Sequence, residues 1–393
     1  MQLLMPTILA SKLLIISVVS MLVPFIADRI KTFHVPPVVF EIILGIIIGP
    51  DVLNLIQPAY QLEVLARIGL IVLIFLAGYE IDVKKIMGQP LNLACLGWIL
   101  SLLIAIGIAY TMRVTGFELD PVFIGLALTT TGLSVLLPIL QDENILKSNV
   151  GLFILAAATL GEFGPIFALS VLLSESKPLI AILFILLFVT VCVISAFLAV
   201  SMRKPHVIRM LRQHLHTSSQ LPVRISMFMI FLLIFLALQL KLNVLIGAFS
   251  AGILVNFFTQ KQDDKVIESK LKAIGFGFLI PLFFIISGTN FDLASLGTLQ
   301  AQVRMLLFLV SLLLVRGLPA YIFYRNIMDR QQQRALALFS STGLPLIVVI
   351  THLGVASGHM LRTNATAMVG AGILSVLIFP LLGLRYLKKS PIK

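Results

Sequence analysis

The sequence predicts an all-α polytopic membrane protein with about 13 transmembrane helices. The chain is 59% hydrophobic and only 12% charged, with a mean hydropathy of +1.08, whereas soluble domains carry about 25% charged residues. Its apolar residues form runs close to the ~20 residues that a helix needs to cross a bilayer. No long polar domain interrupts these runs. In such a chain the net charge of +12 indicates basic cytoplasmic loops rather than nucleic-acid binding.

The predicted spans follow the apolar runs from end to end. The first has no basic residues before it and no small-residue cleavage site, so we expect a retained span rather than a signal peptide. The second and ninth are short or interrupted by Gly and Pro. The spans are 4–27, 35–56, 64–81, 90–112, 121–141, 149–174, 178–202, 222–242, 243–259, 273–290, 302–325, 333–355 and 363–385.

The distribution of Lys and Arg predicts the orientation in the membrane. Of the 29 basic residues, 21 fall in alternate connections beginning with the first, together with the C-terminal tail, and six fall in the other connections. Lys and Arg are enriched in cytoplasmic loops. We therefore expect a multi-pass protein of the cell membrane with its N-terminus outside and its C-terminus inside.

The chain also repeats itself. ALTTTGLSVLLPIL from Ala127 resembles LFSSTGLPLIVVIT from Leu338, an offset of 211 residues, and LIVLIFLAGYEIDV around Gly78 resembles IPLFFIISGTNFDL around Gly288. A weaker match relates the segments around Gly45 and Gly252. Each match joins a span to the one seven later, so the two copies cross the membrane in opposite directions. Inverted repeats of this kind are typical of secondary transporters.

Glu162 is the most informative single residue. It lies in the apolar run LFILAAATLGEFGPIFALSVLL, where a carboxylate at bilayer depth costs about 3 kcal/mol and usually belongs to an ion pathway or a proton relay. Gly161, Gly164 and Pro165 beside it weaken the helix at that point. Glu162 is therefore the candidate for the catalytic position of a transporter.

Two polar breaks interrupt apolar spans at matching positions of the repeat. Such breaks expose carbonyls and helix ends that can face a cation, although Ser and Thr hydroxyls also bond back to their own helix. The first break is Thr129, Thr130, Thr131 and Gly132, and the second is Ser340, Ser341, Thr342 and Gly343. We interpret them as two crossing unwound helices that line the cation site.

Two further charges lie within spans. Arg316 has no charged counterpart in the first copy, and the partner of Glu162 in the second copy is near Ile373. We therefore expect Arg316 and Glu162 to share one cavity, the alternative being an Arg that extends to the membrane interface. Glu41 lies about two turns into its span. Two interpretations of this residue stay open: a structural hydrogen bond, or an accessory role in transport.

With these residues in view, the chain resembles the cation:proton antiporter superfamily, and within it the sodium/hydrogen exchanger family in its bacterial Kef-like branch. The resemblance covers nearly the whole chain. It is carried by the order and spacing of VPPVVFEIILGIIIGP, GLIVLIFLAGYEIDV, LTTTGLSVLLPIL, LGEFGPI, NVLIGAFSAGILVN, VRGLPAYIFYR and SSTGLPL. Kef-type potassium systems carry a further nucleotide-binding domain, which this sequence lacks, so ligand-gated potassium efflux is not expected.

The resemblance implies a homodimer in which a six-helix core moves against a dimerisation domain. Residues 1–89 and 178–300 then form the dimerisation part with a linker span, and residues 90–177 and 301–393 form the two halves of the core. Glu162 matches the family's cation- or proton-binding carboxylate, and Arg316 matches its basic residue on the eleventh helix. Family members that move net charge carry two adjacent acids, whereas here Gly161 precedes a single Glu162, which implies electroneutral exchange.

These observations favour a secondary-active antiporter in which a monovalent cation, Na⁺ or K⁺, and a proton occupy Glu162 in turn. Two alternatives stay open: a sodium-coupled symporter of an organic anion, and a non-transporting membrane sensor subunit. The sequence contains no nucleotide loop, no nucleophile with a base and no metal-ligand spacing. We therefore expect no enzymatic activity, no cofactor, no metal site and no nucleic-acid partner.

Overall fold

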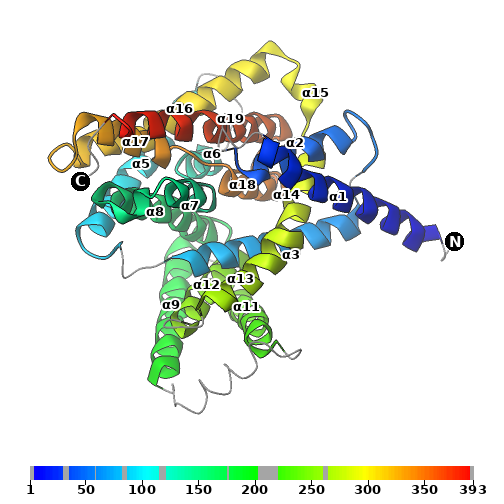
Figure 1. The fold of residues 1–393 in the computed structure, drawn as a ribbon, viewed down its shortest axis with the longest axis horizontal. Helices are drawn as coiled ribbons and strands as arrows, with labels where there is room; N and C mark the ends of the chain where they lie inside the picture. Colours follow the sequence, from blue (N-terminus) through cyan, green and yellow to red (C-terminus); the bar gives the residue numbers. More distant parts are fainter. Residues whose placement is uncertain are drawn as a thin grey trace. The chain divides into compact units, whose positions relative to one another are not determined.

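The computed structural model describes residues 4–29, 35–57, 59–81, 86–114, 121–174, 177–201, 220–259 and 264–389. Within these ranges every regular element is a helix (Figure 1). The all-α fold class is therefore confirmed. The basic connection 202–219, which contributed to the predicted orientation, lies outside the described residues.

Nine helical stretches among the described residues are long and apolar enough to cross a membrane. They are α1 (Leu4–Arg29), α3 (Tyr60–Glu80), α5 (Gln89–Val114), α8 (Asn149–Leu172), α11 (Leu221–Gln239), α13 (Asp264–Ile274) running through a π-helical turn into α14 (Ile280–Thr289), α16 (Leu299–Phe323), α17 (Arg330–Ser340) with α18 (Pro345–Ala356), and α19 (Arg362–Leu387).

Four shorter apolar stretches complete the set in this part of the chain. They lie in α2 (Pro37–Ile48), in α6 (Pro121–Leu128) with α7 (Leu133–Asp142), in α9 (Pro178–Ser201) and in α12 (Val244–Thr259). Each of the predicted spans overlaps one of these stretches. The number that actually cross the bilayer stays a prediction.

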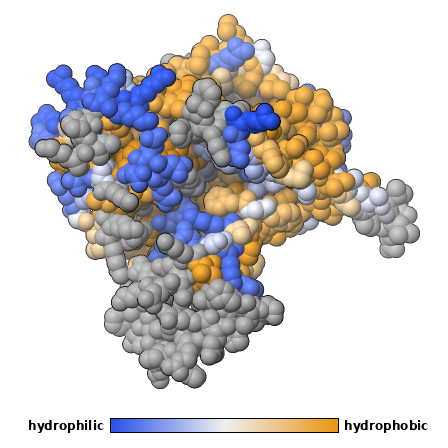
Figure 2. Space-filling view, in the orientation of Figure 1, coloured by the Kyte–Doolittle hydropathy of each residue, from blue (hydrophilic) through white to orange (hydrophobic). Residues whose placement is uncertain are grey.

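The exposed surface is largely apolar, as a lipid environment requires. Large apolar side chains are exposed on most of the long helices, for example Phe25, Leu103 and Phe231, each at least 60% exposed. Figure 2 shows apolar residues over much of the visible face. Because lipid tails are as apolar as these side chains, their exposure carries no penalty in a bilayer.

The chain divides into two compact units. The first comprises residues 1–63, 82–165 and 284–393, in which α16 packs on α5, α17 and α19, and α18 packs on α6 and α19. The second comprises residues 64–81 and 166–283, in which α12 packs on α9 and α11. The division of the chain into dimerisation and core parts remains a prediction.

Each unit contains one close crossing of two glycines. In the first unit, a Cβ on Gly45 of α2 would meet the carbonyl oxygen of Ile285 and lie 3.0 Å from the Cα of Gly288 in α14. In the second unit, a Cβ on Gly252 of α12 would meet the carbonyl oxygen of Phe75 in α3. The repeat equates α2 with α12 and α3 with α14, so the two crossings are counterparts. Small residues let the backbones approach this closely.

Gly252→Ala should lower the thermal stability of the purified protein. The added methyl group would collide with backbone of α3, and overpacking typically costs about 1–3 kcal/mol. Gly107→Ala is the matched control, because Gly107 is an exposed helical glycine of α5 with open space around it. Thermal unfolding in detergent measures both; an unchanged melting temperature for Gly252→Ala would contradict the close crossing.

Candidate functional site

The first helix break lies between α6 and α7. Residues Thr129 to Gly132 are not helical, and the three threonines are fully buried. The hydroxyl groups of Thr129 and Thr130 donate to the carbonyls of Leu126 and Ala127, both at 2.8 Å. Hydroxyls that bond to nearby carbonyls compete with the helical hydrogen bonds. An oxygen that donates its proton in this way still has lone pairs that can face a cation.

The second break lies between α17 and α18. Ser341 and Thr342 donate their hydroxyls to the carbonyls of Ala337 and Leu338, at 2.7 and 3.0 Å. Pro345 at the start of α18 has no N–H and disfavours the helical conformation in the residue before it. The position of this break therefore follows from the local sequence.

The two breaks contact each other directly. The N–H of Gly132 donates to the carbonyl of Thr342 at 2.8 Å, and the Thr131 hydroxyl donates to the carbonyl of Ser340. A Cβ on Gly343 would lie 3.0 Å from the carbonyl oxygen of Thr130. Backbone groups that each broken helix leaves open are thus satisfied by the other break, as an apolar environment requires.

The first break is also joined to α8 beside Glu162. Pro165 cannot donate a helical hydrogen bond, which leaves the carbonyl of Gly161, four residues earlier, without its usual partner. The N–H of Thr131 fills this place at 3.0 Å. A Cβ on Gly161 would collide with the Thr131 side chain. Glu162, the next residue, is buried at 3% exposure.

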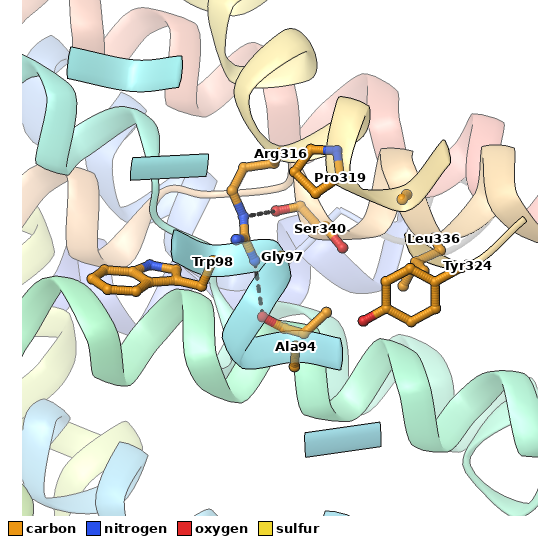
Figure 3. A pocket seen from close by; sticks show the side chains of 10 residues that line it. Ala94, Gly97, Trp98, Arg316, Pro319, Tyr324, Leu336 and Ser340 are labelled. Atoms are coloured by element: carbon orange, nitrogen blue, oxygen red, sulfur yellow. Dashed lines mark hydrogen bonds between the residues drawn. The ribbon is translucent and has the colours of Figure 1, made fainter. Parts of the chain in front are cut away.

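Arg316 of α16 connects both breaks to α8 and α5. Its side chain is buried, with 5% exposure, rather than extended to an interface. Its Nε donates to the Thr131 hydroxyl at 3.1 Å. It also donates to the Ser340 carbonyl at 3.3 Å (Figure 3). Nη1 donates to the Ser101 hydroxyl at 3.4 Å and Nη2 to the Ala157 carbonyl at 2.9 Å. We call these five residues the Arg316 network.

The Arg316 guanidinium also lies close to the helix that carries the acid. A Cβ on Gly161 would be 2.7 Å from Nη2 of Arg316. A buried positive charge therefore lies against the stretch of α8 that carries Glu162. The chain thus brings Gly161, the residue before Glu162, together with Arg316 and both breaks, which are far apart in the sequence. A cavity shared by Arg316 and Glu162 remains a prediction.

Glu41 does not join this cluster. It is buried in α2, at 7% exposure. None of the hydrogen bonds described for the Arg316 network or for the two breaks involves Glu41. An accessory role for Glu41 remains a prediction.

Sequence reasoning missed two serines and a glycine at the site. Ser375 of α19 accepts the N–H of Gly343 at 3.2 Å, and Ser101 of α5 accepts from Arg316. Gly372 lies against the second break, since its Cβ would be 3.0 Å from the Gly343 carbonyl oxygen. The offset of 211 maps Gly161 onto Gly372 and could have identified it. No comparable signal distinguishes the two serines from other buried hydroxyls.

The comparisons with known proteins agree with this architecture. The family model for the transmembrane part of sodium/hydrogen exchangers matches residues 15–388. The chain belongs to the sodium/hydrogen exchanger family. This is a family of transporters rather than enzymes, and the Kef-like branch within it remains a prediction.

Two relatives and one solved structure illustrate the likeness. The chain is 29% identical to the putative Na⁺/H⁺ antiporter YjbQ of Bacillus subtilis, covering 94% of this chain and 61% of that protein. It is 24% identical to the probable Na⁺/H⁺ antiporter 3 of Methanocaldococcus jannaschii, over 91% of this chain and 92% of that one. The sodium proton antiporter MjNhaP1 of the same organism, solved at pH 8, shares the fold with a TM-score of 0.69, 18% identity and coverage of 98% and 100%.

Ser375→Ala should destabilise the protein through the second break. It removes the acceptor of the buried Gly343 N–H, and an unsatisfied buried donor costs about 1–3 kcal/mol. Ser226→Ala is the control, because the buried Ser226 hydroxyl only bonds back to Pro222 of its own helix. Thermal unfolding should show the larger loss for Ser375→Ala; equal losses would argue against its role at the break.

Proposed function

We propose that the chain is a secondary-active antiporter that exchanges a monovalent cation, Na⁺ or K⁺, for a proton at Glu162. The observation that supports the proposal is the hydrogen bond from Thr131 to Gly161, which ties the first helix break to the residue preceding the buried acid. Membership of the sodium/hydrogen exchanger family and the names of the antiporter relatives support it.

The chemistry is competition for one carboxylate. Deprotonated Glu162 supplies the charge that a hard cation needs, and hydroxyl and carbonyl oxygens of the two breaks supply neutral ligands. A proton on Glu162 removes that charge and releases the cation. Arg316 limits the affinity of the site for the cation and for the proton, because its positive charge disfavours a second positive charge nearby. The carbonyl and hydroxyl geometry sets the choice between Na⁺ and K⁺.

Transport then requires that the site face each side of the membrane in turn. We propose an elevator-type motion in which residues 90–177 and 301–393 move as one core against a dimerisation part, within a homodimer. The Arg316 network supports this division, because all of its members lie in those two segments. Hydrogen bonds across the two core halves would let them move as one body.

Glu162→Gln should abolish exchange while the protein still folds, since the amide has a similar shape but cannot take up a proton or balance a cation. Glu162→Asp should retain exchange because it keeps the carboxylate. Proteoliposomes containing a pH-sensitive dye, challenged with Na⁺, K⁺ or Li⁺, measure both variants.

Glu143→Gln, at a half-exposed acid that pairs with Lys388, is the control. Retained exchange in Glu162→Gln would falsify the assignment, and sodium-driven uptake of an organic anion would indicate a symporter instead.

Exchange should be electroneutral, one cation for one proton. Gly161 stands where family members that move net charge carry a second acid, and a Cβ there would meet Thr131 and Arg316. The rate in proteoliposomes should therefore not respond to an imposed membrane potential. A steep dependence on the potential would indicate a second charge-carrying group.

A further inference from the structure

A small cavity adjoins Arg316 on the side of α5, α16 and α17. Its volume is about 20 Å³, compared with the roughly 10–15 Å³ that one water molecule requires. The cavity therefore has room for one small ion or water, and it excludes organic molecules. Figure 3 shows Trp98 and Tyr324 on either side of Arg316 in this view.

The charged group that lines this cavity is a hydrogen-bond donor. The guanidinium of Arg316 has five N–H groups, and its described bonds account for three of them, all to neutral acceptors. The indole N–H of Trp98 is buried and has no acceptor among the described residues. The hydroxyl-bearing residues Tyr324 and Ser340 also line the cavity.

The rest of the lining offers no negative charge. The remaining lining residues, all within the described part of the chain, are glycine, alanine, proline and leucine, without an Asp or Glu. The indole ring of Trp98 is held in place against α8, since a Cβ on Gly164 would collide with it. A buried positive charge with neutral partners and unused donors attracts an anion and repels a cation.

We propose that this cavity binds a small inorganic monovalent anion, such as chloride, held by Arg316 and Tyr324 in the neighbourhood of Trp98. Hydrogen bonds from charged donors to an anion are the strong ones, and the anion gives the buried guanidinium a counter-charge. The anion site adjoins the cation site, because Ser340 of the second break lines the cavity as well, but it takes the opposite charge.

The anion has a defined consequence for transport, which rests on the proposed function. By offsetting the charge of Arg316, it makes both protonation of Glu162 and cation binding easier. Coupling between two sites is reciprocal, so a bound cation should in turn tighten anion binding. Chloride should therefore shift the pH profile of exchange toward higher pH.

Trp98 provides a direct test, because it is the only tryptophan in the 393 residues. Iodide quenches indole fluorescence, so the purified full chain is titrated with iodide at constant ionic strength, with gluconate as the replacing anion. We expect quenching that saturates, in addition to a linear collisional part, and chloride should reverse the saturating part. Sodium should increase the apparent iodide affinity.

Tyr324→Phe should weaken iodide binding by about tenfold, the usual effect of losing one hydrogen bond to a charged group. Tyr321→Phe, an exposed tyrosine one turn earlier on α16, is the matched control and should bind iodide as the natural chain does. Arg316→Gln should lose the saturating part entirely. Tyr324→Phe keeps the test decisive if Arg316→Gln does not fold.

Purely linear quenching that chloride does not change would overturn the proposal, since the cavity would then hold water only. Equal effects of Tyr324→Phe and Tyr321→Phe would also overturn it, because the iodide would then bind elsewhere. Glu162→Gln separates this proposal from the proposed function: it should lose exchange yet still bind iodide. Iodide binding in a natural chain that shows no exchange would contradict the proposed function alone.

Discussion

The site depends on one carbonyl group, that of Gly161. Pro165 leaves it without a helical donor, and Thr131 of the first break donates to it instead. An unsatisfied peptide group in the membrane interior costs several kcal/mol, so this bond fixes where the break meets α8. Glu162 is the next residue along the helix. The same proline that weakens α8 therefore ties the residue next to the acid to the first break.

The two halves of the repeat supply different acceptors for the N–H groups of their helix breaks. In the first half, a backbone carbonyl of α8 accepts from the break at Thr131. In the second half, the side chain of Ser375 in α19 accepts from the break at Gly343. The second solution needs neither a proline nor a charge, and the residue matching Glu162 is Ile373. The two breaks match in the repeat, whereas Glu162 has no charged counterpart in the second half.

Arg316 is a second charge that only one half of the repeat carries. It reaches across from α16 to bond both breaks, α8 and α5, so the segments that carry the oxygens are joined by one side chain. Its guanidinium lies against Gly161, the neighbour of the acid, and also lines the small cavity beside α5. A guanidinium suits this position because its planar fork keeps its charge and bonds several acceptors at once. Structural and electrostatic roles are therefore combined in one residue.

The sequence alone determined the membrane class, the approximate spans, both breaks and the two deep charges. These depend on local properties: the length of apolar runs, the cost of a charge in lipid, and the effect of Pro, Gly and clustered hydroxyls on a helix. Pro345 and the threonines of the first break act on their own segments, and so their effect can be read from the sequence without knowing the fold.

Only the tertiary structure decided which groups meet. Thr131 and Arg316 are 185 positions apart, and nothing in the sequence around either one specifies the other. Ser375, Ser101 and Trp98 lie in apolar runs, and nothing in the sequence around them indicates which groups they contact. Their partners are set by the packing of α5, α8, α16 and α19, because a hydrogen bond forms only where the fold brings donor and acceptor within about 3 Å.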